Sequence, residues 1–176
     1  MITTIDFEIL NFIQEHMRSG FGDIFMKAVT ALGDHGILYI ALTLILLFIG
    51  KTRKTGIRLA AAMIISFVLC NLILKNAVGR IRPYAAADFQ IIISPLSDFS
   101  FPSGHTLFAF AFASVIFSDY RRWGIASFII AALIGFSRLY LYVHYPTDVI
   151  AGAILGGIIG VVTNIIFKAN KNTCCD

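Results

Sequence analysis

Long apolar stretches dominate this chain and predict helices that cross a membrane. A spanning helix needs about 20 predominantly apolar residues, with a range of roughly 17 to 25. Four stretches qualify, the second of them shorter than the others: 57–78, 104–118, 124–143 and 148–167. A fifth stretch, 36–50, reaches the required length if residues 32–35 lie at the membrane interface. The pattern therefore predicts an all-α fold, a polytopic membrane helical bundle with five transmembrane helices.

The N-terminal residues 5–31 follow a different pattern, in which charged side chains punctuate the apolar positions and Ser19-Gly20 interrupts them. We expect two amphipathic helices here, one of which supplies a sixth crossing. At roughly 150 residues per domain, there is room for one integral-membrane domain over 1–176. We expect it to consist of amphipathic helices at 1–32, a transmembrane core at 33–168 and a cytoplasmic tail at 169–176.

The composition supports this class and excludes two others. Hydrophobic residues make up 58% of the chain and charged residues only 14%, against about 25% charged in an ordinary soluble domain. Such a chain is too apolar to be disordered. The net charge of +4 does not indicate a nucleic-acid partner, because the basic residues form short clusters between apolar runs. The N-terminus lacks the pattern of a signal peptide, so we expect none to be removed.

Glycines recur in the last apolar stretch, at Gly152, Gly156, Gly157 and Gly160. They do not form a nucleotide-binding loop, because no strand precedes them and they lie inside an apolar helix. Small residues at helical spacing let two membrane helices approach closely. We therefore expect this stretch to pack tightly against another helix.

The basic clusters also predict orientation, because Lys and Arg in short loops mark the cytoplasmic side. The clusters follow alternate apolar stretches and comprise Lys51, Arg53, Lys54, Arg58, Arg121, Arg122, Lys168 and Lys171. The connections 79–101 and 143–147 should then face outward from the plasma membrane of this multi-pass protein. Arg80 and Arg82 lie in an outward connection and violate the rule. Residues that break an orientation rule are candidates for function.

The first candidate cluster is Lys75 followed by Arg82-Pro83. Lys75 lies near the outer end of its stretch, and Pro83 disfavours helical geometry at Arg82, so the two cations can converge. A Lys inside a membrane helix costs about 2.5 to 3.5 kcal/mol on insertion scales, which favours a position facing the bundle interior and an anion. The alternative is a Lys that extends to the membrane surface.

The second cluster, Pro102-Ser103-Gly104-His105, directly precedes an apolar run. Pro suits the first turn of a helix, so Ser103 and Gly104 would present unpaired backbone N–H groups, which bind anions. His105 would supply a proton. A serine nucleophile is a weaker interpretation, because no Gly-x-Ser-x-Gly turn surrounds Ser103. Taken alone, the tetrapeptide is also compatible with a plain helix start.

The third cluster contains Ser137-Arg138, His144 and Asp148. Arg138 lies in an apolar stretch and must face a polar interior. Pro146 favours a helix start there, which lets Asp148 reach back to His144. A carboxylate on one ring nitrogen fixes the tautomer and leaves the other nitrogen free to attack. For an isolated His and Asp four residues apart, helix capping would explain the pair.

The three clusters together favour a site for a multiply charged oxyanion such as phosphate. They contain three cations and two histidines at outward helix ends, in a chain that otherwise avoids charge. We expect neither a metal nor a cofactor, because three cations repel a divalent ion and no ligand spacing is present. An anion-binding transporter without catalytic chemistry is the non-enzymatic alternative.

The three motifs resemble the complete signature of the type 2 phosphatidic acid phosphatase superfamily. Its order and spacing are met by Lys75 to Arg82-Pro83, by Pro102-Ser103-Gly104-His105, and by Ser137-Arg138 to His144 and Asp148. The resemblance implies a metal-independent lipid phosphatase with a phosphohistidine intermediate. It implies that His144 is the nucleophile, that Asp148 orients it, and that His105 is the acid and base. The implied phosphate-binding residues are Lys75, Arg82, Ser103, Gly104 and Arg138. Arg80, Asp34 and His35 match no position of the signature.

Among the lipids that this resemblance implies, phosphatidylglycerophosphate is the expected substrate. Undecaprenyl diphosphate is the runner-up, and broad activity on phosphatidic acid is a further alternative. The expected partners are a membrane lipid phosphate and the bilayer, with no nucleic acid and no obligate protein partner. The site is expected on the extracytoplasmic side of the plasma membrane.

Overall fold

The computed structural model describes residues 2–169, and every regular element in that range is a helix. Nine of these elements are α-helices: α1 (Ile2–His16), α2 (Gly20–Ala31), α3 (Ile37–Phe48), α4 (Arg53–Phe67), α5 (Lys75–Val78), α6 (Pro83–Ala86), α7 (Gly104–Asp119), α8 (Arg121–Tyr140) and α9 (Pro146–Ala169). A 3-10 turn, η1 (Asp34–Gly36), precedes α3, and a π-helical segment, η2 (Val68–Leu74), joins α4 to α5. The predicted cytoplasmic tail lies, apart from Ala169, outside the described residues.

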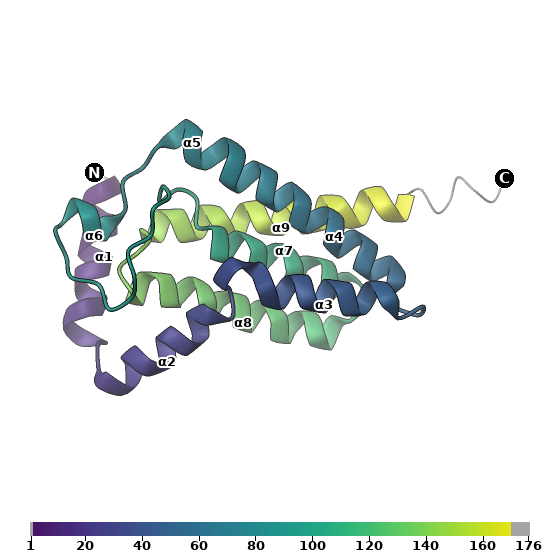
Figure 1. The fold of residues 1–176 in the computed structure, drawn as a ribbon, viewed down its shortest axis with the longest axis horizontal. Coiled ribbons are helices and arrows are strands. Elements are labelled where there is room, and N and C mark those ends of the chain that lie inside the picture. The colour runs from purple at the N-terminus through teal and green to yellow at the C-terminus, as the bar shows by residue number, and fades with distance from the viewer. Residues whose placement is uncertain (1, 170–176) are drawn as a thin grey trace.

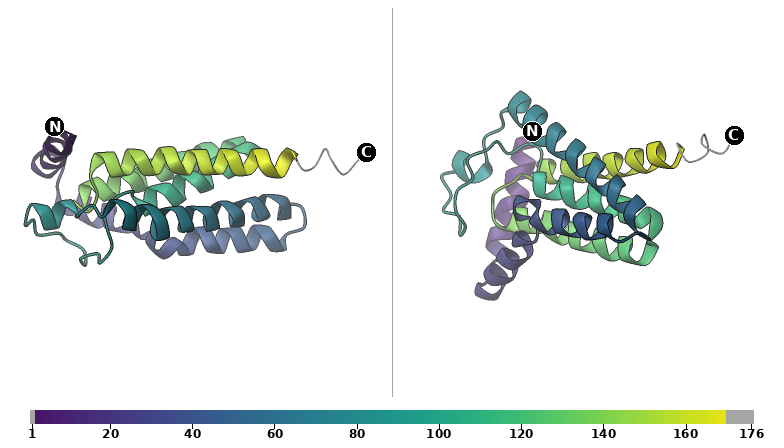
Figure 2. Two further views of the ribbon diagram at one scale, coloured as in Figure 1. Left: turned by 90° about the horizontal axis from the view of Figure 1, so that it is seen from above. Right: turned by 45° about the vertical axis from the view of Figure 1, so that its right-hand side comes forward.

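Five helices run side by side along the longest axis of the molecule: α3, α4, α7, α8 and α9 (Figure 1). Helix α1 lies across one end of this bundle, close to α6 and to the start of α9 (Figures 1 and 2). The connections from α3 to α4 and from α7 to α8 lie at the opposite end. The start of α1 and the end of α9 are therefore at opposite ends of the bundle.

Three helical stretches are long and apolar enough to cross a membrane, namely Arg53–Ala86, Arg121–Tyr140 and Pro146–Phe167. Two further apolar helices, Ile37–Phe48 and Gly104–Asp119, are shorter. The prediction of an all-helical membrane protein is confirmed. Of the two shorter helices, α3 ends at Phe48, before the predicted end at residue 50, whereas α7 has nearly the bounds of the short stretch 104–118 that the sequence predicted.

The N-terminal residues form two helices that separate where the sequence predicted a break. Helix α1 ends at His16, and α2 begins at Gly20 with the Ser19 side chain accepting a hydrogen bond from the backbone N–H of Gly22 (3.1 Å). At 1.5 Å per residue, α1 is about 22 Å long, short of the ~30 Å hydrocarbon core. It lies across the bundle rather than along it (Figure 1).

Arg58 was predicted to lie in a cytoplasmic loop, and the structure places it elsewhere. It lies inside α4, is buried, and forms an ion pair with Asp119 and a hydrogen bond to Asn164 Oδ1 (2.9 Å). Because α4, α7 and α9 each supply one of these residues, the pair ties three helices together at the end of the bundle opposite α1.

Helix α7 is the centre of the bundle and packs most extensively against α9 and α8. The expected close packing of α9 is present. A Cβ at Gly152 would lie 2.7 Å from the backbone oxygen of Ser103, and one at Gly156 would lie 2.3 Å from that of Leu107. These contacts bring the second and third turns of α9 against the first turn of α7. The glycines thereby set the position of the second and third sequence clusters relative to each other.

We predict that Gly156→Ala destabilises the bundle, because the new methyl group would press on the backbone of α7. Overpacking of this kind costs typically about 1–3 kcal/mol. Gly157 is the matched control, because nothing lies within 4 Å of a Cβ there. Gly157→Ala should stabilise the helix by about 0.5–1 kcal/mol. Thermal unfolding of the purified variants in detergent checks both. An equal loss of stability in the two variants would contradict the packing argument.

Candidate active site

The three sequence clusters meet at the end of the bundle where α1 and α6 lie (Figure 1). Lys75 begins α5, and Arg82 directly precedes α6 in extended backbone (φ −70°, ψ 148°), as expected before Pro83. Ser103 is the N-cap of α7 and Gly104 its first residue. Arg138 lies in the last turn of α8, His144 in the connection that follows, and Asp148 in the first turn of α9.

His144 and Asp148 form a buried pair, with 1% and 0% of their surfaces exposed. The ring Nδ1 lies 3.5 Å from Asp148 Oδ2. That oxygen also accepts hydrogen bonds from the Ser100 hydroxyl (2.5 Å) and from the backbone N–H of Tyr145 (3.1 Å). The carboxylate is therefore fixed beside Nδ1. The geometry leaves Nε2 as the ring nitrogen that points away from Asp148.

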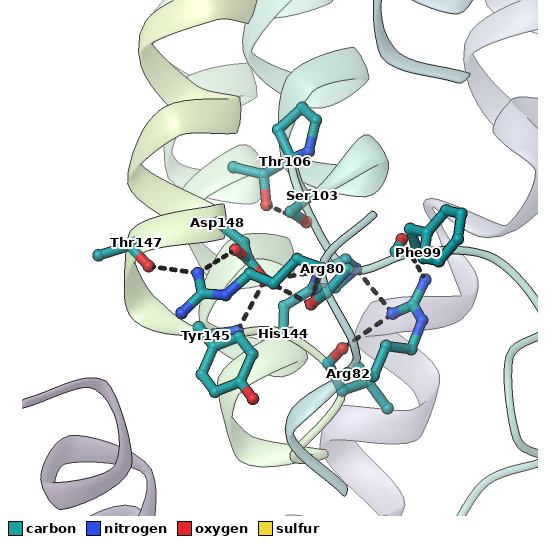
Figure 3. Close-up of polar contacts among 12 residues, drawn as sticks. Arg80, Arg82, Phe99, Ser103, Thr106, His144, Tyr145, Thr147 and Asp148 are labelled. Carbon is teal, nitrogen blue, oxygen red and sulfur yellow. Dashed lines mark hydrogen bonds and ion pairs between the residues drawn. The ribbon is translucent and has the colours of Figure 1, made fainter. Parts of the chain in front are cut away.

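Arg82 faces the other side of the same ring. Its Nη1 lies 3.1 Å from His144 Nε2 and donates a hydrogen bond to the backbone oxygen of Val143 (2.8 Å). Figure 3 shows the imidazole between Asp148 on one side and the Arg82 guanidinium on the other. An oxyanion bound to this guanidinium would therefore lie beside Nε2.

The pKa of His144 is well below its ordinary value. Burial is the largest cause, and the charges of Arg82, Arg138 and Lys75 act in the same direction. The imidazole is therefore neutral near pH 7, and a neutral ring has the lone pair that a nucleophile needs. The cations of the first and third clusters therefore lie close enough to His144 to act on its charge.

Arg138 is a buried guanidinium with incomplete hydrogen bonding. It is 1% exposed, and its Nη1 donates to the hydroxyl of Thr30 (2.5 Å). Its Nε and Nη2 have no hydrogen-bond partner among the described residues. Leaving a buried charge without partners is costly. Two unpaired nitrogen donors on one planar guanidinium suit two oxygens of a phosphate.

The second cluster is only partly drawn into these contacts. The prediction of an unpaired backbone N–H at Ser103 is wrong, because this group donates to the backbone oxygen of Asp148 (3.1 Å); the Ser103 hydroxyl lies 2.9 Å from that of Thr106. Among the described residues, His105 has no hydrogen bond or ion pair with another predicted site residue. Its Nε2 lies 2.9 Å from Asp34 Oδ1 instead. Both histidines nevertheless lie at the same end of the bundle.

Asp98 was not predicted as part of the site, and it binds the cations of the first cluster. It forms ion pairs with Lys75 and with Arg82 Nη2 (2.6 Å). Burial works to raise the pKa of Asp98, but the hydrogen bonds and charges of Lys75 and Arg82 outweigh it and hold the pKa at about 2. The sequence offers no spacing that would have identified this carboxylate, because its partners are 23 and 16 residues away.

Arg80 matches no position of the signature, yet it is in direct contact with Asp148. Its Nη1 donates to Asp148 Oδ1 (2.6 Å) and to the hydroxyl of Thr147 (2.7 Å), and its Nη2 pairs with Asp6 (2.7 Å). The guanidinium also lies 3.7 Å above the ring of Tyr145. Figure 3 shows the Arg80 guanidinium beside Asp148 and Thr147, on the side away from the Arg82 guanidinium. Its violation of the orientation rule was the signal in the sequence that could have identified it.

Comparison with known proteins identifies the family. A model described as the PAP2 superfamily matches residues 55–172, about two thirds of the chain. The chain belongs to the PAP2 superfamily. The resemblance inferred from the three motifs is confirmed, and all three PAP2 motifs lie within the matched range.

Two curated relatives of this PAP2 protein are named as phosphatases. An undecaprenyl-diphosphatase of Sulfolobus acidocaldarius is 36% identical over 68% of this chain and 58% of its own length. A lipid A 4'-phosphatase of Bacteroides thetaiotaomicron is 34% identical over 89% of this chain and 74% of its own length. The chain thus spans less than two thirds of the first relative. The names support the prediction of a hydrolase acting on phosphoric esters at the level of the family.

A solved structure agrees with the fold of this PAP2 chain over nearly its whole length. The crystal structure of a transmembrane PAP2 type phosphatidylglycerolphosphate phosphatase from Bacillus subtilis aligns with a TM-score of 0.80 at 28% identity, covering 96% of this chain and 87% of that one. The membrane context of this protein is therefore shared with a solved relative.

We predict that Asp98→Asn binds inorganic phosphate more tightly, by about tenfold, which corresponds to about 1.4 kcal/mol. The Asp98 carboxylate holds the same N–H groups that a phosphate would need, so a bound anion must displace it. Phosphate-dependent stabilisation against heat, measured in detergent, gives the affinity without any assay of turnover. Asp88→Asn removes an exposed carboxylate from the same connection and should leave the affinity unchanged. Weaker phosphate binding by Asp98→Asn would refute the prediction.

Proposed function

We propose that this protein is a metal-independent lipid phosphate phosphatase that works through a phosphohistidine at His144. The unpaired Nε and Nη2 of buried Arg138 are the observation that carries the proposal. They lie in a cluster of cations around a neutral imidazole, and this combination is suited to an anion that is attacked while it is bound. The residues that would hold the phosphate oxygens are Lys75, Arg82, Ser103, Gly104 and Arg138.

In the first step, His144 Nε2 attacks phosphorus as the bond to the lipid oxygen breaks. Asp148 stabilises the positive charge that develops on the ring, because its Oδ2 lies beside Nδ1. His105 gives a proton to the leaving alkoxide. The cations and the backbone N–H groups of α7 stabilise the charge on the equatorial oxygens, as phosphoryl transfer requires.

In the second step, a water molecule attacks the phosphohistidine and releases inorganic phosphate. His105 now takes the proton of that water, which returns the ring to its starting state. Neither step uses a metal ion. A divalent cation would be repelled by Lys75, Arg82 and Arg138, and within residues 2–169 there is no group of three side chains suited to holding one.

We further infer five crossings of the membrane. They are α2, η1 and α3 together, then the stretch from α4 to α5, and then α7, α8 and α9. An odd number agrees with the opposite positions of α1 and the end of α9 (Figure 1). Helix α1 would then lie along the surface instead of supplying a sixth crossing. Apart from Arg58, the basic residues of the α3–α4 and α7–α8 connections lie at the end of the bundle opposite the site. Since such residues mark the cytoplasmic side, we infer a plasma-membrane protein whose site faces the extracytoplasmic side.

The favoured substrate is phosphatidylglycerophosphate. A site at the membrane surface receives a headgroup while the acyl chains stay in the bilayer, and the solved relative with a TM-score of 0.80 is named for this activity. Undecaprenyl diphosphate is the second candidate, favoured by the 36% identity to a protein named as an undecaprenyl-diphosphatase. Broader activity on phosphatidic acid remains an alternative.

We predict that His144→Ala lowers turnover by more than about a thousandfold, because removal of a nucleophile leaves only binding and charge stabilisation. The variant should also fail to form an acid-labile phosphoenzyme from labelled substrate. His16→Ala, at an exposed position on α1, is the matched control and should behave as the unmodified protein. Hydrolysis that persists in a folded His144→Ala protein would exclude the proposed mechanism. Phosphate binding without hydrolysis in the unmodified protein would instead favour an anion-binding transporter.

We predict the highest kcat/KM for phosphatidylglycerophosphate when it is compared with undecaprenyl diphosphate, phosphatidic acid and lipid A in matched micelles. Phosphate release is measured with a chelator present throughout, which should not reduce the rate. A larger kcat/KM for undecaprenyl diphosphate would transfer the assignment to that lipid. Loss of activity in chelator that a divalent ion restores would overturn the metal-independent mechanism.

A further inference from the structure

We propose that Asp34 is a positioning residue for His105, fixing the imidazole so that Nδ1 is the atom that gives and takes the proton. This inference rests on the proposed function. Asp34 lies in η1, 71 residues before His105, and its Oδ1 is 2.9 Å from His105 Nε2. The contact gives His105 a carboxylate partner of its own, as Asp148 is the partner of His144.

The backbone around Asp34 holds the ring from a second direction. A Cβ at Gly33 would lie 2.6 Å from His105 Cδ2, so the backbone at this residue lies directly against the imidazole. Gly36 has φ +67°, a conformation that glycine adopts without strain, and it lets the chain turn from η1 into α3. The imidazole edge and its Nε2 are thus both fixed by residues 33–36.

The surroundings of His105 explain why a carboxylate is needed there. An acid must carry its proton until the leaving oxygen takes it, but His105 is mostly buried and lies at the positive end of α7. Both influences disfavour the imidazolium. The charge of Asp34 opposes them. A fully exposed ion pair between a His and an Asp would contribute little. Here the Asp34 side chain is 48% exposed and the His105 side chain 20% exposed, so solvent screens the contact only in part.

One contact then serves both steps of the reaction. In the first step the imidazolium holds Nε2–H toward Asp34, and the Nδ1 proton passes to the alkoxide as the phosphorus–oxygen bond breaks and the bond to His144 forms. The ring is left neutral with its lone pair on Nδ1. In the second step Nδ1 takes a proton from the attacking water as the phosphorus–nitrogen bond breaks. The Nε2–H proton stays with the same nitrogen throughout.

The test compares two substrates that differ in their need for an acid. 4-Nitrobenzyl phosphate releases an alkoxide, which must be protonated, whereas 4-nitrophenyl phosphate of nearly the same size releases a stable phenolate. In Asp34→Asn the first turnover of the benzyl ester should fall by about 30- to 100-fold, within the usual contribution of an acid catalyst. The nitrophenyl ester should still give a burst of one phenolate per protein at nearly the original rate, followed by slow turnover.

Two variants serve as controls for this comparison. Asp34→Glu keeps the carboxylate and should restore most of the benzyl ester activity. Asp88→Asn removes a carboxylate from an exposed position and should change neither substrate. An equal loss on both esters in the first turnover, or no loss on either, would overturn the assignment. Failure of the unmodified protein to hydrolyse any phosphate ester would instead refute the proposed function.

A second measurement does not depend on turnover. The ¹⁵N shifts of the His105 ring in detergent should report a proton on Nε2 in the unmodified protein and in Asp34→Glu. They should report a mixture of tautomers in Asp34→Asn. A neutral ring with its proton on Nδ1 instead of Nε2 in the unmodified protein, or an unchanged tautomer in Asp34→Asn, would overturn the inference even if the kinetic result were favourable.

Discussion

The cost of holding several positive charges at the end of an apolar bundle governs the arrangement of this site. Each cation is balanced differently. Lys75 and Arg82 share the carboxylate of Asp98, and Arg80 is held between Asp6 and Asp148. Arg138 has only the Thr30 hydroxyl. Within the described residues, carboxylates thus neutralise Lys75, Arg80 and Arg82. The buried guanidinium of Arg138 keeps hydrogen-bond donors that have no partner.

Close packing of α7 on α9 fixes the positions of the charged groups relative to one another. Because Gly152 and Gly156 let the two backbones touch, the start of α7 lies beside the Asp148 carboxylate at the start of α9. Side chains of ordinary size at these positions would separate the two helix ends. The distance between the second and third motifs is therefore set by residues that carry no chemistry themselves.

Much of the fold and the core of the site follow from local sequence patterns. Apolar stretches predicted the long helices, Pro83 predicted the extended backbone at Arg82, and the spacing of His144 and Asp148 predicted their contact. Other residues could not be found in this way. Asp98, Asp34 and Ser100 act through partners that lie 16 to 71 residues away, and only the tertiary fold brings such residues together. The position of α1 could not be predicted from the sequence either. An amphipathic pattern is equally suited to a helix that crosses the membrane within a bundle and to one that lies along the membrane surface.

The salt bridges of Arg80 have a mechanical consequence. Helix α1 supplies Asp6, which accepts hydrogen bonds from both the backbone and the hydroxyl of Thr147 as well as from Arg80. A displacement of α1 that withdrew Asp6 from Arg80 would leave Asp148 to neutralise the whole charge of that guanidinium. Asp148 would then interact less strongly with His144.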